Sequence, residues 1–174
     1  MNVHDFLKHL TVPDIKDYCK RNVIPVSIAM THTTGDFNLG SVIRNCNFFG
    51  FNQFFYIGGK KSFDRRSTVG THNYTPIKHY KTEEDFISEN WGKFSFVSVE
   101  NNINYDCKDA FNYKWDFNNT IVIFGEEKSG IPDNILRLSK DIISITAFGS
   151  VRSLNVGTAS GIIMSLIRRQ FHNY

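Results

Sequence analysis

The sequence predicts an α/β protein, with a mostly parallel sheet flanked by helices. Short apolar runs such as residues 120–124 show no alternation of apolar and polar residues, which is typical of strands buried on both faces. These runs alternate along the chain with segments whose apolar residues recur at helical spacing. The 174 residues contain no internal repeat and no linker, so we expect one domain with a sizeable core.

The expected elements can be taken in chain order. They are two short helices within residues 3–22, a strand over 25–30, a helix over 39–49, a strand over 53–57, a helix from residue 82, strands over 94–99 and 120–124, a helix over 132–138, a strand over 142–145 and a helix from residue 156. Residues 1–24 form a helical amino-terminal segment in this interpretation, and residues 25–174 form the single domain. Residues 101–119 receive no assignment.

Local signals justify the helix boundaries. Pro13 interrupts the first helical segment, because proline disfavours helix in the residue before it. Gly50 ends the helix over 39–49 as a C-cap would. Thr82 begins a pattern that resembles a capping box, and Pro132 suits the first turn of its helix.

Composition limits the class of protein. The chain is 41% hydrophobic and 14% aromatic, which indicates a folded protein, and its net charge of +3 permits a polyanionic partner. The three cysteines and six histidines are scattered without ligand spacing, so we expect reduced thiols and no metal site. No apolar run reaches the roughly 18 residues of a membrane span and no targeting segment is evident, which favours a cytoplasmic protein without a membrane partner.

Three loops follow the carboxyl ends of expected strands, where open α/β sheets place their ligands. The first leads into Asn38 and Arg44, for which a helix cap and an exposed helical cation are the simpler interpretations. The second, residues 125–132, contains two glycines but no phosphate-binding pattern, and its acids favour a ligand with hydroxyls or a positive centre. The third, residues 146–153, is rich in small residues and suits a backbone that approaches a ligand closely.

Taken together, the three loops resemble the motifs of the TrmH-type RNA ribose 2′-O-methyltransferases of the SPOUT superfamily. The matching residues are Asn38-x-Gly40-x-x-x-Arg44 with Phe49-Gly50, then Phe124-Gly125 with Gly130-Ile131-Pro132, and finally Ile145, Gly149 and Ser153-Leu154-Asn155-Val156. The resemblance spans roughly residues 25–170. It implies a deep carboxy-terminal trefoil knot, S-adenosylmethionine as cofactor, a homodimer and an RNA substrate, with tRNA favoured over rRNA.

The resemblance also implies residue roles. The catalytic set is Arg44, Asn38, Glu126, Ser153 and Asn155, and the cofactor set is Glu100, Phe124, Gly125, Glu126, Gly130, Ile145 and Leu154. Because a guanidinium is a poor base, Arg44 either acts as a base in an unusual environment or stabilises the alkoxide while an RNA phosphate takes the proton. The sequence leaves both open.

The window from Lys60 to Gly70 is the most basic in the chain. Its cations Lys60, Lys61, Arg65 and Arg66, together with Arg44, are candidates for RNA binding. A solvated loop is the competing interpretation of such a charge run. An RNA substrate raises the weight of the binding interpretation, because phosphate contacts supply most non-specific affinity.

Three residues depart from the family pattern. Thr146 and Ala147 stand where the family usually has proline and methionine, and Gly157 stands where it usually has serine. The altered motif motivates the alternative of a catalytically inactive knotted RNA-binding protein. A generic nucleotide-binding domain is disfavoured, because the phosphate-binding glycine pattern is missing.

Overall fold

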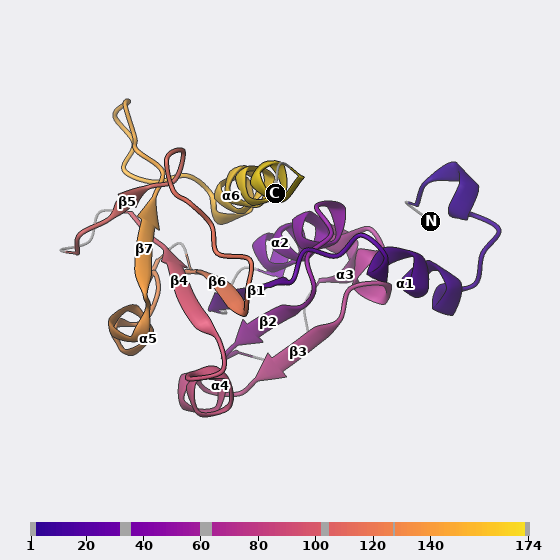
Figure 1. Cartoon of the computed structure of the whole chain (residues 1–174), viewed down its shortest axis with the longest axis horizontal. Coiled ribbons are helices and arrows are strands. Elements are labelled where there is room, and N and C mark those ends of the chain that lie inside the picture. Colours follow the sequence, from indigo (N-terminus) through magenta and orange to yellow (C-terminus); the bar gives the residue numbers. More distant parts are fainter. Residues whose placement is uncertain (1–2, 32–35, 60–63, 102–104, 127, 173–174) are drawn as a thin grey trace.

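The protein is a parallel sheet with helices packed on both faces (Figure 1). The computed structural model describes residues 3–31, 36–59, 64–101, 105–126 and 128–172. The strands are β1 (Val26–Thr31), β2 (Phe54–Ile57), β3 (Ile77–Tyr80), β4 (Ser95–Val99), β5 (Lys108–Asp109), β6 (Thr120–Phe124) and β7 (Asp141–Ser144). The α-helices are α1 (Val12–Lys20), α2 (Asp36–Phe48), α3 (Arg65–Thr68), α4 (Glu83–Asn90), α5 (Asp133–Leu138) and α6 (Val156–His172), and 3₁₀ turns lie at η1 (Asp5–Leu7) and η2 (Thr71–Asn73).

The sheet has seven strands in the order β3-β2-β1-β6-β4-β7-β5, and every pairing between neighbouring strands is parallel. The central strands β1 and β6 pair with Ile28 opposite Val122. β1 is buried along its whole length, which explains its lack of alternation in the sequence. The expected mostly parallel sheet is confirmed.

The two faces of the sheet carry separate hydrophobic clusters. Ile28 and Met30 of β1 pack with α2 and α6, whereas Ala29 between them packs with the cluster that includes α4 and α5. This division follows from the alternation of side chains along a strand. In Figure 1, α2 and α6 accordingly lie on one side of the sheet, with α4 and α5 on the other.

Residues 105–119, which the sequence left unassigned, run over the α6 side of the sheet. After the short strand β5, the aromatic side chains of Tyr113, Trp115 and Phe117 are buried in the same cluster as α2 and α6. Gln170 of α6 donates a hydrogen bond to the backbone carbonyl of Tyr113 at 2.8 Å. This segment therefore closes the core with aromatic side chains instead of a regular helix or long strand.

Several expected boundaries need correction. The two short segments expected within residues 3–22 are η1 and α1, but the break between them precedes Pro13, which lies in the first turn of α1, where its missing N–H costs nothing. Asn38 does not cap α2, because the helix already begins at Asp36. Pro132 is the N-cap residue of α5 and precedes its first turn.

The amino-terminal segment has a small cluster of its own. Leu7 and Ile15 are buried there with Tyr74, which follows η2. Within the described ranges, no helix is long and apolar enough to cross a membrane. The described residues also contain no group of three or more His, Cys, Asp or Glu side chains placed to hold a metal ion.

Candidate functional site

A cavity of about 240 Å³ opens at the carboxyl ends of β4, β6 and β7. This is the edge at which parallel α/β sheets bind ligands. Every residue that the resemblance assigned to the cofactor lines this cavity. They are Glu100, Phe124, Gly125, Glu126, Gly130, Ile145 and Leu154, and Ser153 lies among them. The residues that the resemblance assigned to the cofactor therefore share one cavity, while their roles stay predictions.

Two glycines shape the turn after β6. Gly125 packs against the backbone of Gly130, and a Cβ on Gly125 would lie 2.5 Å from the carbonyl carbon of Gly130. Gly130 has φ +67°, a conformation that side-chain-bearing residues adopt only with strain. Its N–H donates to the carbonyl of Glu126 at 2.9 Å. The turn therefore folds back on itself along the wall of the cavity.

Glu100 and Thr31 anchor this turn from neighbouring strands. Glu100 Oε2 accepts a hydrogen bond from Ile131 N at 3.0 Å, and the missing side chain of Gly130 makes room for this carboxylate. The buried Thr31 Oγ1 accepts from Glu126 N at 3.1 Å and lies 3.3 Å from the carbonyl of Gly130. Glu100 was expected to line the pocket, and it does so as a carboxylate that holds the chain's own backbone.

Glu126 lies at the mouth of the cavity. Its Oε2 accepts a hydrogen bond from Ser129 Oγ at 2.7 Å, and its side chain is half-buried. Lys128 and Arg152 also line the cavity, so the wall carries charges of both signs. Such a mixture suits a ligand with its own positive and negative groups better than a polyphosphate.

The backbone of Ile145 is held by one side chain. Ile145 N donates to Asn101 Oδ1 at 3.2 Å, and Asn101 Nδ2 donates to the carbonyl of Ile145 at 2.9 Å. Both residues line the cavity. Asn101 was not singled out from the sequence, because one asparagine in a polar loop forms no recognisable pattern.

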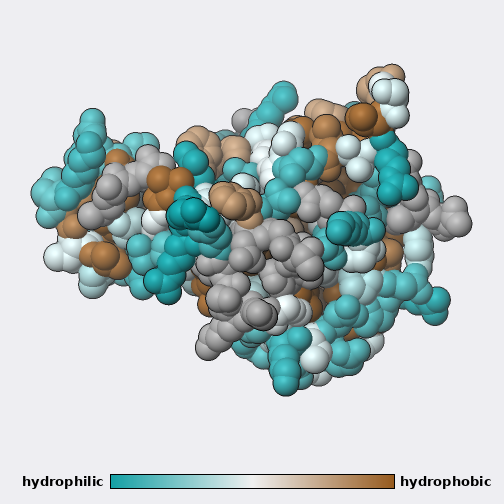
Figure 2. Space-filling view, turned by 180° about the vertical axis from the view of Figure 1, so that it is seen from behind, coloured by the Kyte–Doolittle hydropathy of each residue, from teal (hydrophilic) through white to brown (hydrophobic). Residues whose placement is uncertain are grey.

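The loop between β7 and α6 projects from the body of the protein (Figure 1). Thr146 and Ala147 are exposed in it, and the ring of Phe148 is 94% exposed. Figure 2 shows an apolar tip at this projection. Farther along the loop, Leu154 returns to the cavity wall, so one end of the loop forms part of the site and the tip faces outward.

A second cluster lies where α2 meets the start of α6. Asn155 Oδ1 accepts from the N–H groups of Gly157 at 2.9 Å and Thr158 at 3.3 Å, so Asn155 caps the start of α6. Its Nδ2 donates to Asn38 Oδ1 at 2.9 Å. Asn45 of α2 adds a hydrogen bond from Nδ2 to the carbonyl of Gly157 at 2.9 Å.

Gly157, a departure from the family pattern, lies where α6 packs closely against Ser41 of α2. A Cβ there would lie 3.0 Å from both Asn155 Oδ1 and Ser41 Cβ. Glycine therefore permits the two helices to pack closely at the point where Asn155 reaches Asn38.

Arg44 is exposed on α2 and does not line the cavity. It lies six residues beyond Asn38, which is about 9 Å along a helix axis. The structure thus brings Asn38 and Asn155 together and leaves Arg44 on the outer surface of the same helix. Within the described part of the chain, Arg44 makes no hydrogen bond or ion pair.

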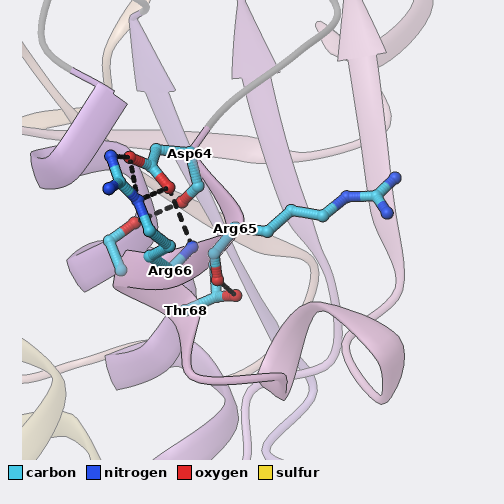
Figure 3. A network of polar contacts seen from close by, with 5 residues as sticks. Asp64, Arg65, Arg66 and Thr68 are labelled. Carbon is cyan, nitrogen blue, oxygen red and sulfur yellow. Dashed lines mark hydrogen bonds and ion pairs between the residues drawn. The ribbon is translucent and has the colours of Figure 1, made fainter.

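The basic window is only partly described, and Lys60 and Lys61 lie outside the described residues. Arg66 forms an ion pair with Asp64 at 2.5 Å, whereas the side chain of Arg65 extends away from this pair (Figure 3). Burial and the nearby charge of Arg65 lower the pKa of His72, which favours a neutral imidazole. Both described arginines are exposed, and of the two only Arg66 is paired with an acid among the described residues.

The cavity fits S-adenosylmethionine by the chemistry of its wall. Ile131, Leu154 and Val156 supply apolar surface for a flat base, and the backbone of Ile145 carries one donor and one acceptor, both of which Asn101 bonds here. The carboxylates of Glu100 and Glu126 suit hydroxyls or a positive centre. A parallel sheet with this cavity at its carboxyl edge, beside the hydrogen-bonded Asn38 and Asn155, is the arrangement expected of a TrmH-type RNA methyltransferase.

Comparison with known proteins gives the same class. The SpoU rRNA Methylase family matches residues 25–165, and the chain belongs to this family. A tRNA (guanosine(18)-2′-O)-methyltransferase of Thermus thermophilus is 24% identical over 162 residues, which cover 90% of this chain and 80% of the relative.

Solved structures share the fold. The Aquifex aeolicus TrmH/SpoU tRNA modifying enzyme superposes with a TM-score of 0.81 at 19% identity, covering 93% of this chain and 83% of that one. An S-adenosylmethionine-bound rRNA methyltransferase from Sinorhizobium meliloti gives a TM-score of 0.74 at 23% identity, covering 83% of this chain and 56% of that one.

Proposed function

We propose that this protein transfers a methyl group from S-adenosylmethionine to the ribose 2′-hydroxyl of an RNA, and that the RNA is a tRNA. The observation that carries the proposal is the meeting of all three motifs at one edge of the sheet. Gly125, Ile145 and Leu154 line a single cavity, and Asn155 bonds to Asn38 beside it. The name of the Thermus thermophilus relative supports tRNA as the substrate.

In this proposal the cofactor supplies a methyl group on a sulfonium centre. The turn at Gly125 and Gly130 and the backbone at Ile145 hold the cofactor, and Glu126 faces its polar portion. Asn38 and Asn155 orient the ribose, while Ser153 holds the loop on the substrate side. Arg44 lowers the energy of the alkoxide or accepts its proton, and Arg65 contacts RNA phosphates.

A homodimer is part of the proposal. Arg44 is exposed on α2, away from the cavity of its own chain. A second copy that packs against α2 would bring Arg44 of one protomer to the substrate side of the other. Such assembly of one site from two chains is consistent with an isologous dimer.

The trefoil knot and the cellular compartment are also proposed. The packing of α6 on α2, beside a cavity shared by the turns after β6 and β7, supports a carboxy-terminal helix that passes through an earlier loop. An activity on tRNA supports a cytoplasmic location.

The test is transfer of labelled methyl from S-adenosylmethionine to unmodified total tRNA and, separately, to rRNA, followed by nucleoside analysis. A 2′-O-methylated nucleoside from tRNA is expected. Arg44→Ala should abolish transfer with cofactor affinity retained, and Lys93→Ala, an exposed cation after α4, should behave like the wild type.

Other outcomes of this test choose between the alternatives. The Sinorhizobium meliloti neighbour is named an rRNA methyltransferase, so labelling of rRNA alone would replace tRNA with rRNA as the substrate. Cofactor binding without transfer to either RNA would point to another methyl acceptor. Absence of cofactor binding as well would favour an inactive RNA-binding protein. Thr146 and Ala147, where the motif is altered, would then be the first residues to restore.

A further inference from the structure

The side chain of Asn101 forms hydrogen bonds with both the N–H and the carbonyl of Ile145, a residue of the cavity wall. Its Oδ1 accepts from Ile145 N at 3.2 Å and its Nδ2 donates to the carbonyl of Ile145 at 2.9 Å. The orientation of the amide is fixed, because a flipped amide would place its NH₂ against the N–H of Ile145. An N–H has a single hydrogen to give, so Ile145 N cannot serve another acceptor while Asn101 holds it.

The amide of asparagine and the Watson–Crick edge of adenine have the same hydrogen-bonding pattern. Adenine presents an amino donor at N6 beside an acceptor at N1, as the primary amide presents NH₂ beside its oxygen. A backbone that offers one N–H and one carbonyl can satisfy either group. Ile145 therefore offers the same two bonds to Asn101 and to an adenine base.

We propose that the side chain of Asn101 stands in for the adenine of the cofactor and exchanges with it. This inference rests on the proposed function, in which the cofactor carries adenine and Ile145 contributes to its site. With the cofactor absent, Asn101 satisfies the polar groups of Ile145 and keeps that backbone in the orientation that accepts an adenine edge. When the base enters, it takes over these bonds and the amide turns to solvent.

The surroundings of Asn101 permit this exchange. The backbone N–H of Asn101 donates to Glu100 Oε1 at 2.9 Å, so the main chain stays anchored when the side chain turns. Asn101 is half-buried, and rotation of an amide at the surface of a cavity breaks no packing of the core. Within the described ranges its side-chain amide bonds to Ile145 alone.

The exchange lowers the apparent affinity for the cofactor. The base binds only to molecules in which Asn101 has turned away from Ile145. The apparent dissociation constant is therefore the intrinsic constant divided by the fraction of molecules in that state. Two neutral hydrogen bonds of about 1 kcal/mol each, partly replaced by water, give a penalty of about tenfold. Removal of the amide should therefore tighten binding and speed association.

The experiment measures binding of S-adenosylhomocysteine by calorimetry and stopped-flow fluorescence. Asn101→Ala should bind up to about tenfold more tightly than the wild type and associate faster. Asn101→Leu, which has a similar shape without either polar group, should show the same gain. Asn118→Ala, an exposed asparagine just before β6 at the opposite edge of the sheet, should match the wild type.

Unchanged or weaker binding by both Asn101 variants, with normal binding by the wild type, would overturn the role of Asn101 and leave the proposed function intact. Absence of binding by the wild type would overturn both. A measurement on the unaltered protein covers the case in which the variants misfold. The side-chain NH₂ signals of Asn101 in a ¹⁵N spectrum should move to the positions of a solvated amide when S-adenosylhomocysteine is added, and unmoved signals would contradict the exchange.

Discussion

Asn155 donates a hydrogen bond to Asn38 Oδ1 at 2.9 Å, joining two residues that lie 117 positions apart in the chain. The same Asn155 caps α6 by accepting the N–H groups of Gly157 and Thr158. One amide thus fixes the start of α6 and ties it to the first turn of α2. The position of the proposed ribose-binding residues therefore depends on a helix cap.

The first prediction separates these two duties of Asn155. Asn155→Ala removes the cap and the bond to Asn38, so it should lower the free energy of unfolding by about 1 kcal/mol and also reduce methyl transfer. Thr82 is a matched control, because its Oγ1 caps α4 by accepting from Asp85 N at 3.2 Å. Thr82→Ala should cost a similar stability and leave the activity unchanged.

Denaturant unfolding and methyl-transfer rates measured on both variants check this prediction. Equal activity of the two variants would mean that Asn155 serves only as a cap.

The second prediction concerns the turn after β6. Gly130→Ala places a Cβ 2.6 Å from Glu100 Oε2, at a residue with φ +67°. It should therefore disturb the bond from Ile131 N to Glu100 and weaken cofactor binding, in addition to a strain of about 1 kcal/mol. Gly92→Ala is the control, since Gly92 has φ +84° but no atom within 4 Å of the added Cβ.

Calorimetric titration with S-adenosylhomocysteine distinguishes the two glycines. Gly92→Ala should lose stability with normal affinity, whereas Gly130→Ala should lose both. Normal affinity in Gly130→Ala would show that the cavity does not depend on the position of Glu100.

The third prediction uses the difference between two adjacent arginines. Arg65 extends away from the ion pair that Arg66 forms with Asp64 (Figure 3). If this surface contacts RNA, Arg65→Ala should reduce the slope of log affinity against log salt by about 0.7 to 0.9, the contribution of one phosphate contact. Arg66→Ala should change the slope less, because Asp64 already neutralises that charge.

Binding of tRNA over a series of salt concentrations measures both slopes. An unchanged slope for Arg65→Ala would show that Arg65 does not contact RNA and that this segment is a solvated surface.

The central strands and the turn after β6 could be predicted from the sequence because their signals are local, whereas the other residues of the cavity wall followed only from the family resemblance. Residues 120–124 form an uninterrupted apolar run, and the structure buries all of them in β6. The glycines of the turn after this strand also mark the close approach of Gly125 to Gly130. Each of these features depends on residues that are neighbours in the chain.

The edge strands and the partners of individual side chains could not be predicted. In β3, the half-buried Lys78 and His79 dilute the apolar pattern of a strand at the edge of the sheet. β5 has only two residues and exists because it pairs with β7. Asn101 bonds to Ile145 although the two residues lie 44 positions apart in the chain, and no local sequence pattern indicates such a contact.

The last prediction concerns stability at low pH. Asp141 at the start of β7 accepts hydrogen bonds from Lys108 and, at 2.7 Å, from Tyr113 Oη, and its side chain is only 11% exposed. Burial raises the pKa of this carboxyl, but the two hydrogen bonds outweigh burial, and the net pKa lies below the ordinary value of 3.8. The folded state therefore holds the ionised form more tightly than the unfolded state does.

The contribution of Asp141 to the free energy of unfolding decreases at low pH. Because the folded pKa is depressed, this contribution is complete above about pH 5 and is lost as the pH falls through the folded pKa. Asp141→Asn should lower the free energy of unfolding by about 2 kcal/mol at neutral pH, since it removes charge-assisted hydrogen bonds. The difference from the wild type should narrow as the pH approaches 2.

Urea unfolding between pH 7 and pH 2 measures this difference, and Asp17→Asn is the control. Asp17 also has a lowered pKa, caused by its hydrogen bond and ion pair with Lys20, but both side chains are exposed. Exposed pairs are screened by water and salt, so this variant should follow the wild-type curve. A constant gap between Asp141→Asn and the wild type over the whole pH range would show that the loss arises from packing and not from the ionised carboxylate.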